Sequence, residues 1–329
     1  MTGHWVVTGG AGFIGSHLVE HLLARGDRVT VFDNFATGAV GNLAACAGDP
    51  RLAIRTGDVA TGEGLADTVA GASGVFHCAA VAGVQECIAD WFGAHATNVT
   101  GAIRTFDAAV RAGRVPVVYA SSAAVYGDRS GEPCREDMPV RPMSPYGADK
   151  LACEHQARAF REIHGLPTAG LRLFNVYGPR QAATSSYSGV LSQFVRNWRS
   201  GQANVIFGDG GQTRDFVQVG DVVGAMVAAM ERLLVQSDCL VSNVCTGRPV
   251  SVLDLVATIG RITGGRPRAP EFRPARSGEI RHSLGDTRQM VALLGRRRIT
   301  PLEEGLRSYL CSLDPDRTGV DGPMVRAAE

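Results

Sequence analysis

The chain has 329 residues, of which 45% are hydrophobic, and its formal net charge at pH 7 is +1. This length allows a large apolar core, as one α/β unit or as a domain with a smaller lobe, and the charge gives no reason to expect nucleic-acid or membrane partners. No apolar run could span a bilayer, the N-terminus lacks the basic region of a secretory signal, and the eight cysteines contain no Cys-x-x-Cys pair, so we expect a cytoplasmic protein with no disulfide framework and no metal site.

Short apolar runs alternate with helical patterns through the first half of the chain. Near-continuous apolar strands that alternate with helices are typical of a parallel sheet covered on both faces. Residues 1–175 are therefore predicted to form a doubly wound α/β domain of the Rossmann type that binds a dinucleotide. The predicted strands are Trp5–Thr8, Arg28–Asp33, Leu52–Arg55, Gly74–Cys78, Val115–Ser121 and Thr168–Phe174, and the predicted helices are Ile14–Arg25, Gly64–Val69, Ala94–Ala112 and Gly147–His164.

The pattern becomes less regular after residue 176. We expect residues 176–313 to form mainly a smaller α/β substrate lobe over the carboxyl edge of the sheet, with some segments returning to the first domain. Residues 314–329 are polar and rich in Gly and Pro, which predicts a frayed tail. The helices expected in this half are Val190–Arg199, Val222–Leu234, Val252–Thr263 and Leu302–Leu313, and the turn clusters are Gly208–Gly211, Thr246–Pro249 and Gly264–Pro274.

A glycine-rich loop follows the first predicted strand and opens the first predicted helix. Glycines at Gly9, Gly12 and Gly15 allow a tight turn and let the backbone approach a pyrophosphate at the helix N-terminus. Phe13 and Ile14 complete this loop, and we expect them to contact the same ligand. Strand, loop and helix occur in the order that dinucleotide binding requires, so the loop predicts a nucleotide site rather than a plain turn.

Acidic residues end the second and third predicted strands. The Asp33 carboxylate can accept hydrogen bonds from the ribose hydroxyls and would repel a 2′-phosphate, which favours NAD over NADP. Asn34 follows directly and no arginine does. Asp58, followed by Val59, suits the adenine amino group, although a carboxylate that only caps a turn is an equal alternative.

Tyr146 and Lys150 are four residues apart and share one face of a predicted helix. Lys150 is the only lysine in the chain, which indicates a place where a compact ammonium is required and a guanidinium does not serve. A nearby ammonium and a cationic nicotinamide would favour the phenolate of Tyr146, and so make it a usable base. Ser122, at the end of the fifth predicted strand, can bond both a substrate hydroxyl and the tyrosine.

The order of these motifs resembles the nucleotide-sugar epimerase/dehydratase branch of the extended short-chain dehydrogenases, over residues 4 to about 311. The resemblance implies that Tyr146 is the base and acid at the sugar O4, that Ser122 assists it, and that Lys150 holds the cofactor ribose. It also implies a homodimer formed by the helices Ala94–Ala112 and Gly147–His164. Besides the residues above, the motifs that carry it are Gly57-Asp58, His77-Cys78-Ala79-Ala80, Asn98-Val99, Asn175 to Gln181, and Gly208-Asp209-Gly210 to Arg214-Asp215-Phe216.

The resemblance assigns further residues to the two ligands. Ala79, Ala80 and Asn98 would line the NAD site. Asn175, Arg214 and Arg276 would hold the substrate diphosphate, since arginines suit phosphate oxygens, Glu279 would accept from the nucleotide ribose, and Ser283 would face the sugar.

The reaction type is inferred from two alanines. Dehydratases of this family carry Asp and Glu directly after the catalytic Ser or Thr, whereas Ala123 and Ala124 stand there and can neither give nor take a proton. This favours epimerisation at C4 through a transient 4-keto sugar. Related epimerases of carboxylated sugars carry a basic residue directly after the Pro-Arg-Gln motif, so the resemblance implies that Ala182, after Gln181, disfavours a carboxylated sugar. By the same resemblance, the small Ser283 favours UDP-GlcNAc/GalNAc or UDP-Glc/Gal.

Two other readings stay open. One is a nucleotide-sugar 4-keto reductase or dehydrogenase with the same Ser, Tyr and Lys, or another sugar modification in secondary metabolism. Departures from the family pattern at Gly83, Trp91 and Gly220 leave room for it. The other is a non-catalytic NAD-binding scaffold, which the intact Ser122, Tyr146 and Lys150 disfavour.

Overall fold

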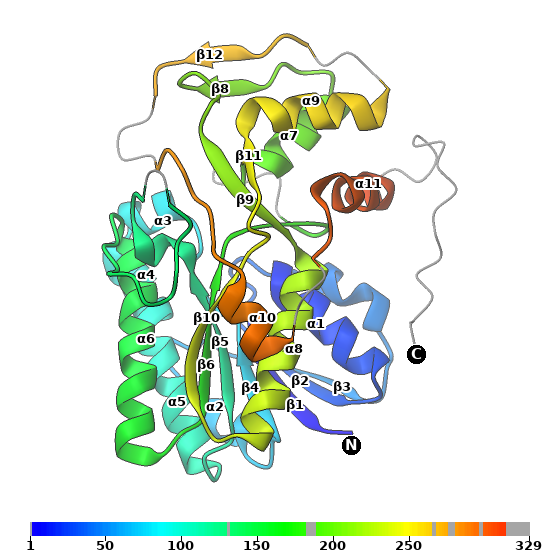
Figure 1. The fold of residues 1–329 in the computed structure, drawn as a ribbon. Coiled ribbons are helices and arrows are strands. Elements are labelled where there is room, and N and C mark those ends of the chain that lie inside the picture. Colours follow the sequence, from blue (N-terminus) through cyan, green and yellow to red (C-terminus); the bar gives the residue numbers. More distant parts are fainter. Residues whose placement is uncertain are drawn as a thin grey trace.

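The computed structural model describes residues 2–129, 132–181, 189–264, 268–275, 280–295 and 299–313. Figure 1 shows a larger α/β unit, with a smaller lobe at one end of its sheet. No helix among these residues is long and apolar enough to cross a membrane.

The larger unit is built on seven parallel strands in the order β10-β6-β5-β4-β1-β2-β3. From the central β1 the chain moves outward through β2 and β3, then returns to the other side of β1 with β4. The crevice at the carboxyl ends of β1 and β4 is therefore the switch point where ligands bind in open α/β sheets. The strands are β1 (His4–Thr8), β2 (Arg28–Asp33), β3 (Leu52–Thr56), β4 (Gly74–His77), β5 (Val117–Ser122), β6 (Thr168–Leu173) and β10 (Cys239–Val244).

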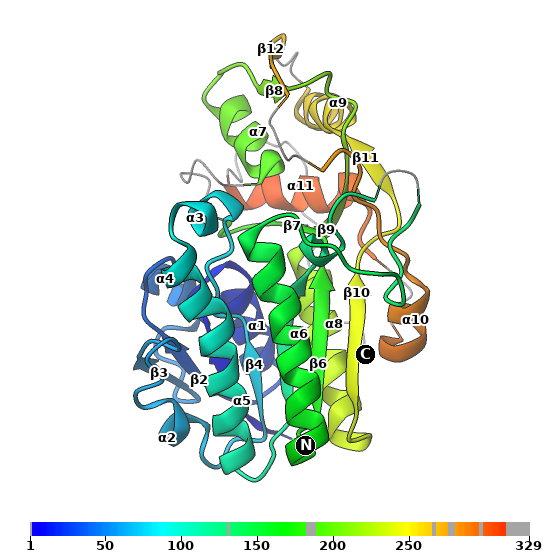
Figure 2. The same ribbon diagram turned by 90° about the vertical axis from the view of Figure 1, so that its left-hand side faces the viewer.

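Helices cover both faces of this sheet, as the apolar strands predicted. Two buried apolar clusters lie on its opposite sides, and Figure 2 shows α5 and α6 side by side over one face. That face carries α2 (Leu65–Val69), α5 (Gly101–Arg111) and α6 (Pro145–His164), and the other face carries α1 (Phe13–Ala24), α8 (Val219–Val235) and α10 (Arg288–Leu294). The predicted doubly wound fold is confirmed.

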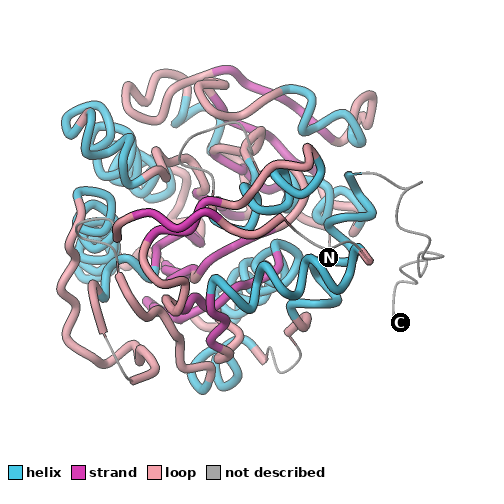
Figure 3. The backbone as a smooth tube through the Cα atoms, turned by 90° about the horizontal axis from the view of Figure 1, so that it is seen from above, coloured by secondary structure: helices cyan, strands magenta, loops and turns pink. Residues whose placement is uncertain are grey.

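The smaller lobe has its own buried cluster, formed around Phe194, Phe216 and Leu255. It contains a three-stranded sheet in the order β11-β9-β7 and a two-stranded sheet of β12 and β8, and Figure 3 shows it from above. Its elements are β7 (Asn175–Tyr177), α7 (Val190–Arg199), β8 (Val205–Phe207), β9 (Thr213–Gln218), β11 (Pro249–Ser251), α9 (Val252–Thr263), β12 (Glu271–Arg273) and α11 (Leu302–Leu313).

Some elements differ from the sequence predictions. The helix predicted at Ala94–Ala112 begins earlier, because the Asp90 side chain accepts a hydrogen bond from Gly93 N at 2.9 Å, and a π-helical stretch interrupts it. Strand β10 was not predicted, and β12 lies inside a predicted turn cluster. The remaining helices are η1 (Val40–Cys46), α3 (Val84–Ala89), α4 (Trp91–His95), the π-helical η2 (Ala96–Thr100) and η3 (Ala123–Tyr126).

Candidate active site

The glycine loop between β1 and α1 packs so closely against the neighbouring backbone that it has no room for side chains. Gly9 has φ +68°, and a Cβ on it would lie 2.6 Å from Ala79 N. A Cβ on Gly15 would lie 2.1 Å from the carbonyl oxygen of Gly9, so only glycine lets the helix start this close to the loop. Gly12 is the N-cap of α1 and provides no capping side chain, so the helix N-terminus suits a phosphate. Phe13 and Ile14, the first two residues of α1, are half-buried at this end of the helix.

Asp33 holds the glycine loop as well as closing β2. Its Oδ2 accepts a hydrogen bond from Ala11 N at 2.9 Å and its Oδ1 accepts one from Phe35 N at 2.8 Å. Because each carboxylate oxygen has further lone pairs, Asp33 can accept from a diol in addition. This carboxylate and the glycine cradle fit the adenosine and pyrophosphate of a dinucleotide.

The next strand ends bring further predicted residues to the same edge. Asn34 Nδ2 donates to Asp58 Oδ2 at 3.1 Å, and Asp58 Oδ1 accepts from Ala60 N at 2.7 Å. Asp58 thus caps its own turn, with Val59 buried beside it. This capping role does not prevent the carboxylate from also binding the adenine amino group.

Asn98 is fully buried behind the loop that follows β4. Its Oδ1 accepts from Val81 N at 2.9 Å, and its Nδ2 donates to Val81 O at 3.2 Å. Ala79 and Ala80 precede Val81 and are partly exposed. The Asn98 side chain therefore shapes the loop that carries these alanines.

The structure brings Tyr146 and Lys150 to the end of β5. Ser144 caps α6, accepting from Gly147 N at 3.1 Å, so that Tyr146 lies in the first turn. The Lys150 side chain is 3% exposed, donates from Nζ to the carbonyl oxygen of Ala120 at 2.9 Å, and lies 5.8 Å from the centre of the Tyr146 ring. Ser122, two residues after Ala120, accepts from Ala124 N at 3.1 Å.

His77 and Cys78 lie close by but are unsuited to proton or group transfer. Burial, and then repulsion by Lys150, lower the pKa of His77 to about 3. The neutral ring contacts Thr8 Oγ1 at 2.7 Å and Thr105 Oγ1 at 3.3 Å, so its role is structural. Burial raises the pKa of the Cys78 thiol to about 12, which keeps it protonated.

Arg180 links the smaller lobe to the cofactor helix, a role that the sequence did not predict. It has φ +65°, and its Nη1 and Nη2 donate to Glu20 Oε1 and Oε2 at 2.8 and 2.6 Å. His17 Nε2 faces Pro179 O at 2.9 Å, which makes Nε2 the donor. His17 Nδ1 then accepts from Arg180 Nη2 at 2.6 Å. The segment at Pro179 and Arg180, which leads into the smaller lobe, is thereby held to α1.

The described residues include only some of the predicted substrate residues. Asn175 lies on β7, paired with Phe216 of β9. Arg214, on β9, donates from Nη1 to the carbonyl oxygens of Thr213 at 2.9 Å and Arg281 at 3.3 Å, and Ser283 N donates to the same Thr213 oxygen at 3.1 Å. Arg276 and Glu279, predicted to contact the substrate, lie outside the described residues. So does Ala182, which is predicted to disfavour a carboxylated sugar.

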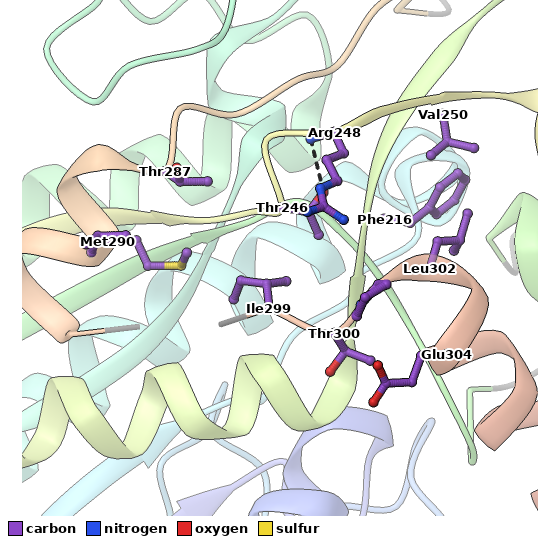
Figure 4. A pocket seen from close by; sticks show the side chains of 12 residues that line it. Phe216, Thr246, Arg248, Val250, Thr287, Met290, Ile299, Thr300, Leu302 and Glu304 are labelled. Atoms are coloured by element: carbon purple, nitrogen blue, oxygen red, sulfur yellow. Dashed lines mark hydrogen bonds between the residues drawn. The ribbon is translucent and has the colours of Figure 1, made fainter. Parts of the chain in front are cut away.

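A cavity of about 520 Å³ lies elsewhere, between β9, α10 and the start of α11. Figure 4 shows Met290 on one side of it and Phe216 and Val250 on the other. Arg248 and Glu304 also line it, and none of the predicted catalytic or cofactor residues does. The candidate active site is therefore the carboxyl edge of the sheet, not this cavity.

Comparisons with known proteins agree with this geometry. Residues 5–240 match the model of the NAD dependent epimerase/dehydratase family. A UDP-glucose 4-epimerase of Mycolicibacterium smegmatis is 36% identical over 310 residues, which cover 92% of this chain and 95% of that protein.

Two solved structures are similar over nearly the whole chain. The UDP-N-acetylglucosamine 4-epimerase from Methanobrevibacter ruminantium, in complex with UDP-N-acetylmuramic acid, has a TM-score of 0.88 and 32% identity, covering 94% of this chain and 97% of that one. The UDP-glucose 4-epimerase of Thermus thermophilus, in complex with NAD, has a TM-score of 0.82 and 33% identity, covering 93% and 97%.

Proposed function

Because the chain belongs to the NAD-dependent epimerase/dehydratase family, we propose that it inverts C4 of a UDP-hexose through a transient 4-keto sugar. The observation that carries this proposal is the placement of Tyr146 and Lys150 in the first turns of α6, with Lys150 bonded to β5 two residues before Ser122. In that arrangement the one lysine of the chain is buried against the strand end that carries the serine. Both similar structures described above are of 4-epimerases.

Each catalytic residue has one task in this reaction. NAD, which the glycine cradle and Asp33 would hold, would supply reversible hydride transfer at C4. Tyr146 removes the O4 proton as the hydride leaves and gives it back when the hydride returns, so that no net redox change occurs. Ser122 would donate a hydrogen bond to O4, and the Lys150 ammonium would bond the cofactor ribose. Inversion follows if the 4-keto sugar turns over between the two hydride transfers.

The apolar residues after Ser122 favour epimerisation over dehydration. Removal of water across C5 and C6 needs an acid and a base beside the sugar. Ala123 and Ala124 open η3 directly after Ser122, and Ala124 donates its backbone N–H to Ser122 Oγ. These two positions thus provide no acid or base for the removal of water.

The substrate proposal rests on the smaller lobe. We propose that Asn175 and Arg214, with Arg276, hold the diphosphate and that Glu279 holds the nucleotide ribose, which leaves the sugar free to rotate. The small Ser283 would leave room for an N-acetyl group, which supports UDP-GlcNAc/GalNAc or UDP-Glc/Gal as the substrate.

The assembly proposed is a homodimer through α5 and α6. Besides the family resemblance, α4, which contacts η2 and α6, exposes the apolar side chains of Trp91 at 60% and Phe92 at 90%, and a partner subunit would cover them. Light scattering at micromolar concentration tests this, and a monomer would contradict it. A reducing, cytoplasmic location is supported by the eight cysteines, which form no disulfide in the described part of the chain.

The test of the reaction is proton NMR of the purified protein with UDP-glucose, UDP-galactose, their N-acetyl counterparts and UDP-glucuronic acid, with and without added NAD. We expect one UDP-hexose to reach equilibrium with its C4 epimer without net redox change. The Tyr146→Phe variant should keep NAD and lose turnover. An oxidised, reduced or dehydrated product would retain the family and refute the reaction.

A further inference from the structure

A buried ion pair lies directly behind the proposed active site. Arg172 of β6 donates from Nη2 to Glu154 Oε2 at 2.7 Å and from Nε to Glu154 Oε1 at 2.9 Å. Their side chains are only 6% and 7% exposed. Taking such a pair out of water offsets most of its attraction, so stability alone is a weak reason for it. Its contacts to other elements show what else it does.

Glu154 joins α6 to the end of β5. Lys150 and Glu154 follow Tyr146 at intervals of four residues, so all three lie along one side of the helix. Lys150 Nζ bonds the carbonyl oxygen of Ala120 at 2.9 Å, and Glu154 Oε1 accepts from Ser121 Oγ at 2.5 Å. The end of β5 is thereby bonded to α6 at two points. Ser122 directly follows Ser121 in the strand, and Tyr146 lies one helix turn before Lys150.

Arg172 holds the chain on the other side of Ser122. Its guanidinium lies 4.8 Å from the centre of the Tyr126 ring, within the range of a cation–π contact. Tyr126 ends η3, four residues after Ser122, and its hydroxyl donates to Asn243 Oδ1 of β10 at 2.7 Å. The same ion pair therefore contacts residues on both sides of Ser122.

We propose that Glu154 and Arg172 are positioning residues, which set the spacing between Ser122 on β5 and Tyr146 on α6. This inference rests on the proposed function, because the spacing matters only if both hydroxyls act on the same O4. Apolar packing of a helix on a sheet is not directional and tolerates sliding, whereas charge-assisted hydrogen bonds are short and directional. The pair thus fixes the register of α6 along β5, where a misplacement of about 1 Å can lower a rate on the order of 10²-fold.

The experiment compares three variants with the wild type in the proposed epimerase reaction. Ser121→Ala cuts the link from the intact ion pair to β5, and Glu154→Gln removes the carboxylate. Thr168→Val is the matched control, since it removes an equally buried hydroxyl at the amino end of the parallel strands, where Thr168 Oγ1 donates to Cys239 Sγ at 3.2 Å. For each protein kcat, KM, bound NAD and the unfolding midpoint are measured, with kinetics well below that midpoint.

We expect Ser121→Ala and Glu154→Gln to lower kcat by about 10- to 100-fold with KM and bound NAD unchanged, and Thr168→Val to keep wild-type kcat. Wild-type kcat in Ser121→Ala overturns the proposal, and so does a loss that Thr168→Val shares at equal stability. If Glu154→Gln does not fold, Ser121→Ala decides alone. A wild-type protein that binds NAD but turns over no UDP-sugar refutes the proposed function instead, because the variants are judged only against an active wild type.

Discussion

The buried imidazole of His77 makes the stability of the protein depend on pH between neutrality and pH 5. Burial lowers the pKa of His77 to about 3 in the folded state, against about 6.5 in an unfolded chain. Below pH 6.5 the unfolded state therefore binds a proton that the folded state refuses, so stability falls as pH falls through the unfolded value and continues to fall toward pH 3. At pH 5 the solution is about 1.5 pH units below the unfolded-state pKa. At about 1.4 kcal/mol per unit, His77 therefore lowers the free energy of unfolding by about 2 kcal/mol at this pH.

The assay is urea unfolding at pH 7 and at pH 5, for the wild type, His77→Asn and the control His155→Asn. Asparagine can still bond Thr8 without titrating, whereas His155 lies exposed on α6. The wild type and the control should lose about 2 kcal/mol more than His77→Asn on going from pH 7 to pH 5. Burial also lowers the pKa of His4 and His17, but these contribute equally to all three proteins. Parallel losses in all three would refute the assignment of a neutral His77.

Three further predictions concern the candidate site. Gly15→Ala, whose Cβ would lie 2.1 Å from the carbonyl oxygen of Gly9, should weaken NAD binding at least about tenfold, measured by calorimetry, and unchanged affinity would contradict the cradle. Lys150→Arg should lower kcat by about 10²-fold or more, because a planar guanidinium does not replace the ammonium that bonds Ala120; wild-type kcat in this variant would remove the special role of the single lysine. Arg180→Met should lower stability by about 1.5–3 kcal/mol, because Glu20 and His17 lose their charged donor, and a shift below about 0.5 kcal/mol would show that the link is unimportant.

Local patterns were enough to predict the elements that carry the candidate site. Each of these elements combines a regular local pattern with a characteristic residue. They are the glycine loop, the strand that ends in Asp33, and the helix with Tyr146 and Lys150. The comparisons support the family that these motifs predicted. Their chemical roles remain proposals.

Long-range pairings were beyond the reach of local patterns. Strand β10 pairs with β6, about seventy residues earlier in the sequence. The composition of β10 alone does not indicate which strand it will pair with. The π-helical stretch at Ala96–Thr100 looks helical in sequence, since its break lies in backbone hydrogen bonding. Glu154, four residues after Lys150, was visible as a helix-face neighbour, but its partner Arg172 became evident only in three dimensions.

The central claim is that hydride leaves C4 and returns to C4, and it is tested most directly by running the reaction in D₂O and analysing the product by mass spectrometry and NMR. The account predicts a C4 epimer without deuterium on carbon, because the hydride is held by bound NAD and Tyr146 exchanges only the O4 proton. Deuterium at C5 or C6 would show that the sugar loses protons from carbon, and would contradict the proposed 4-epimerisation.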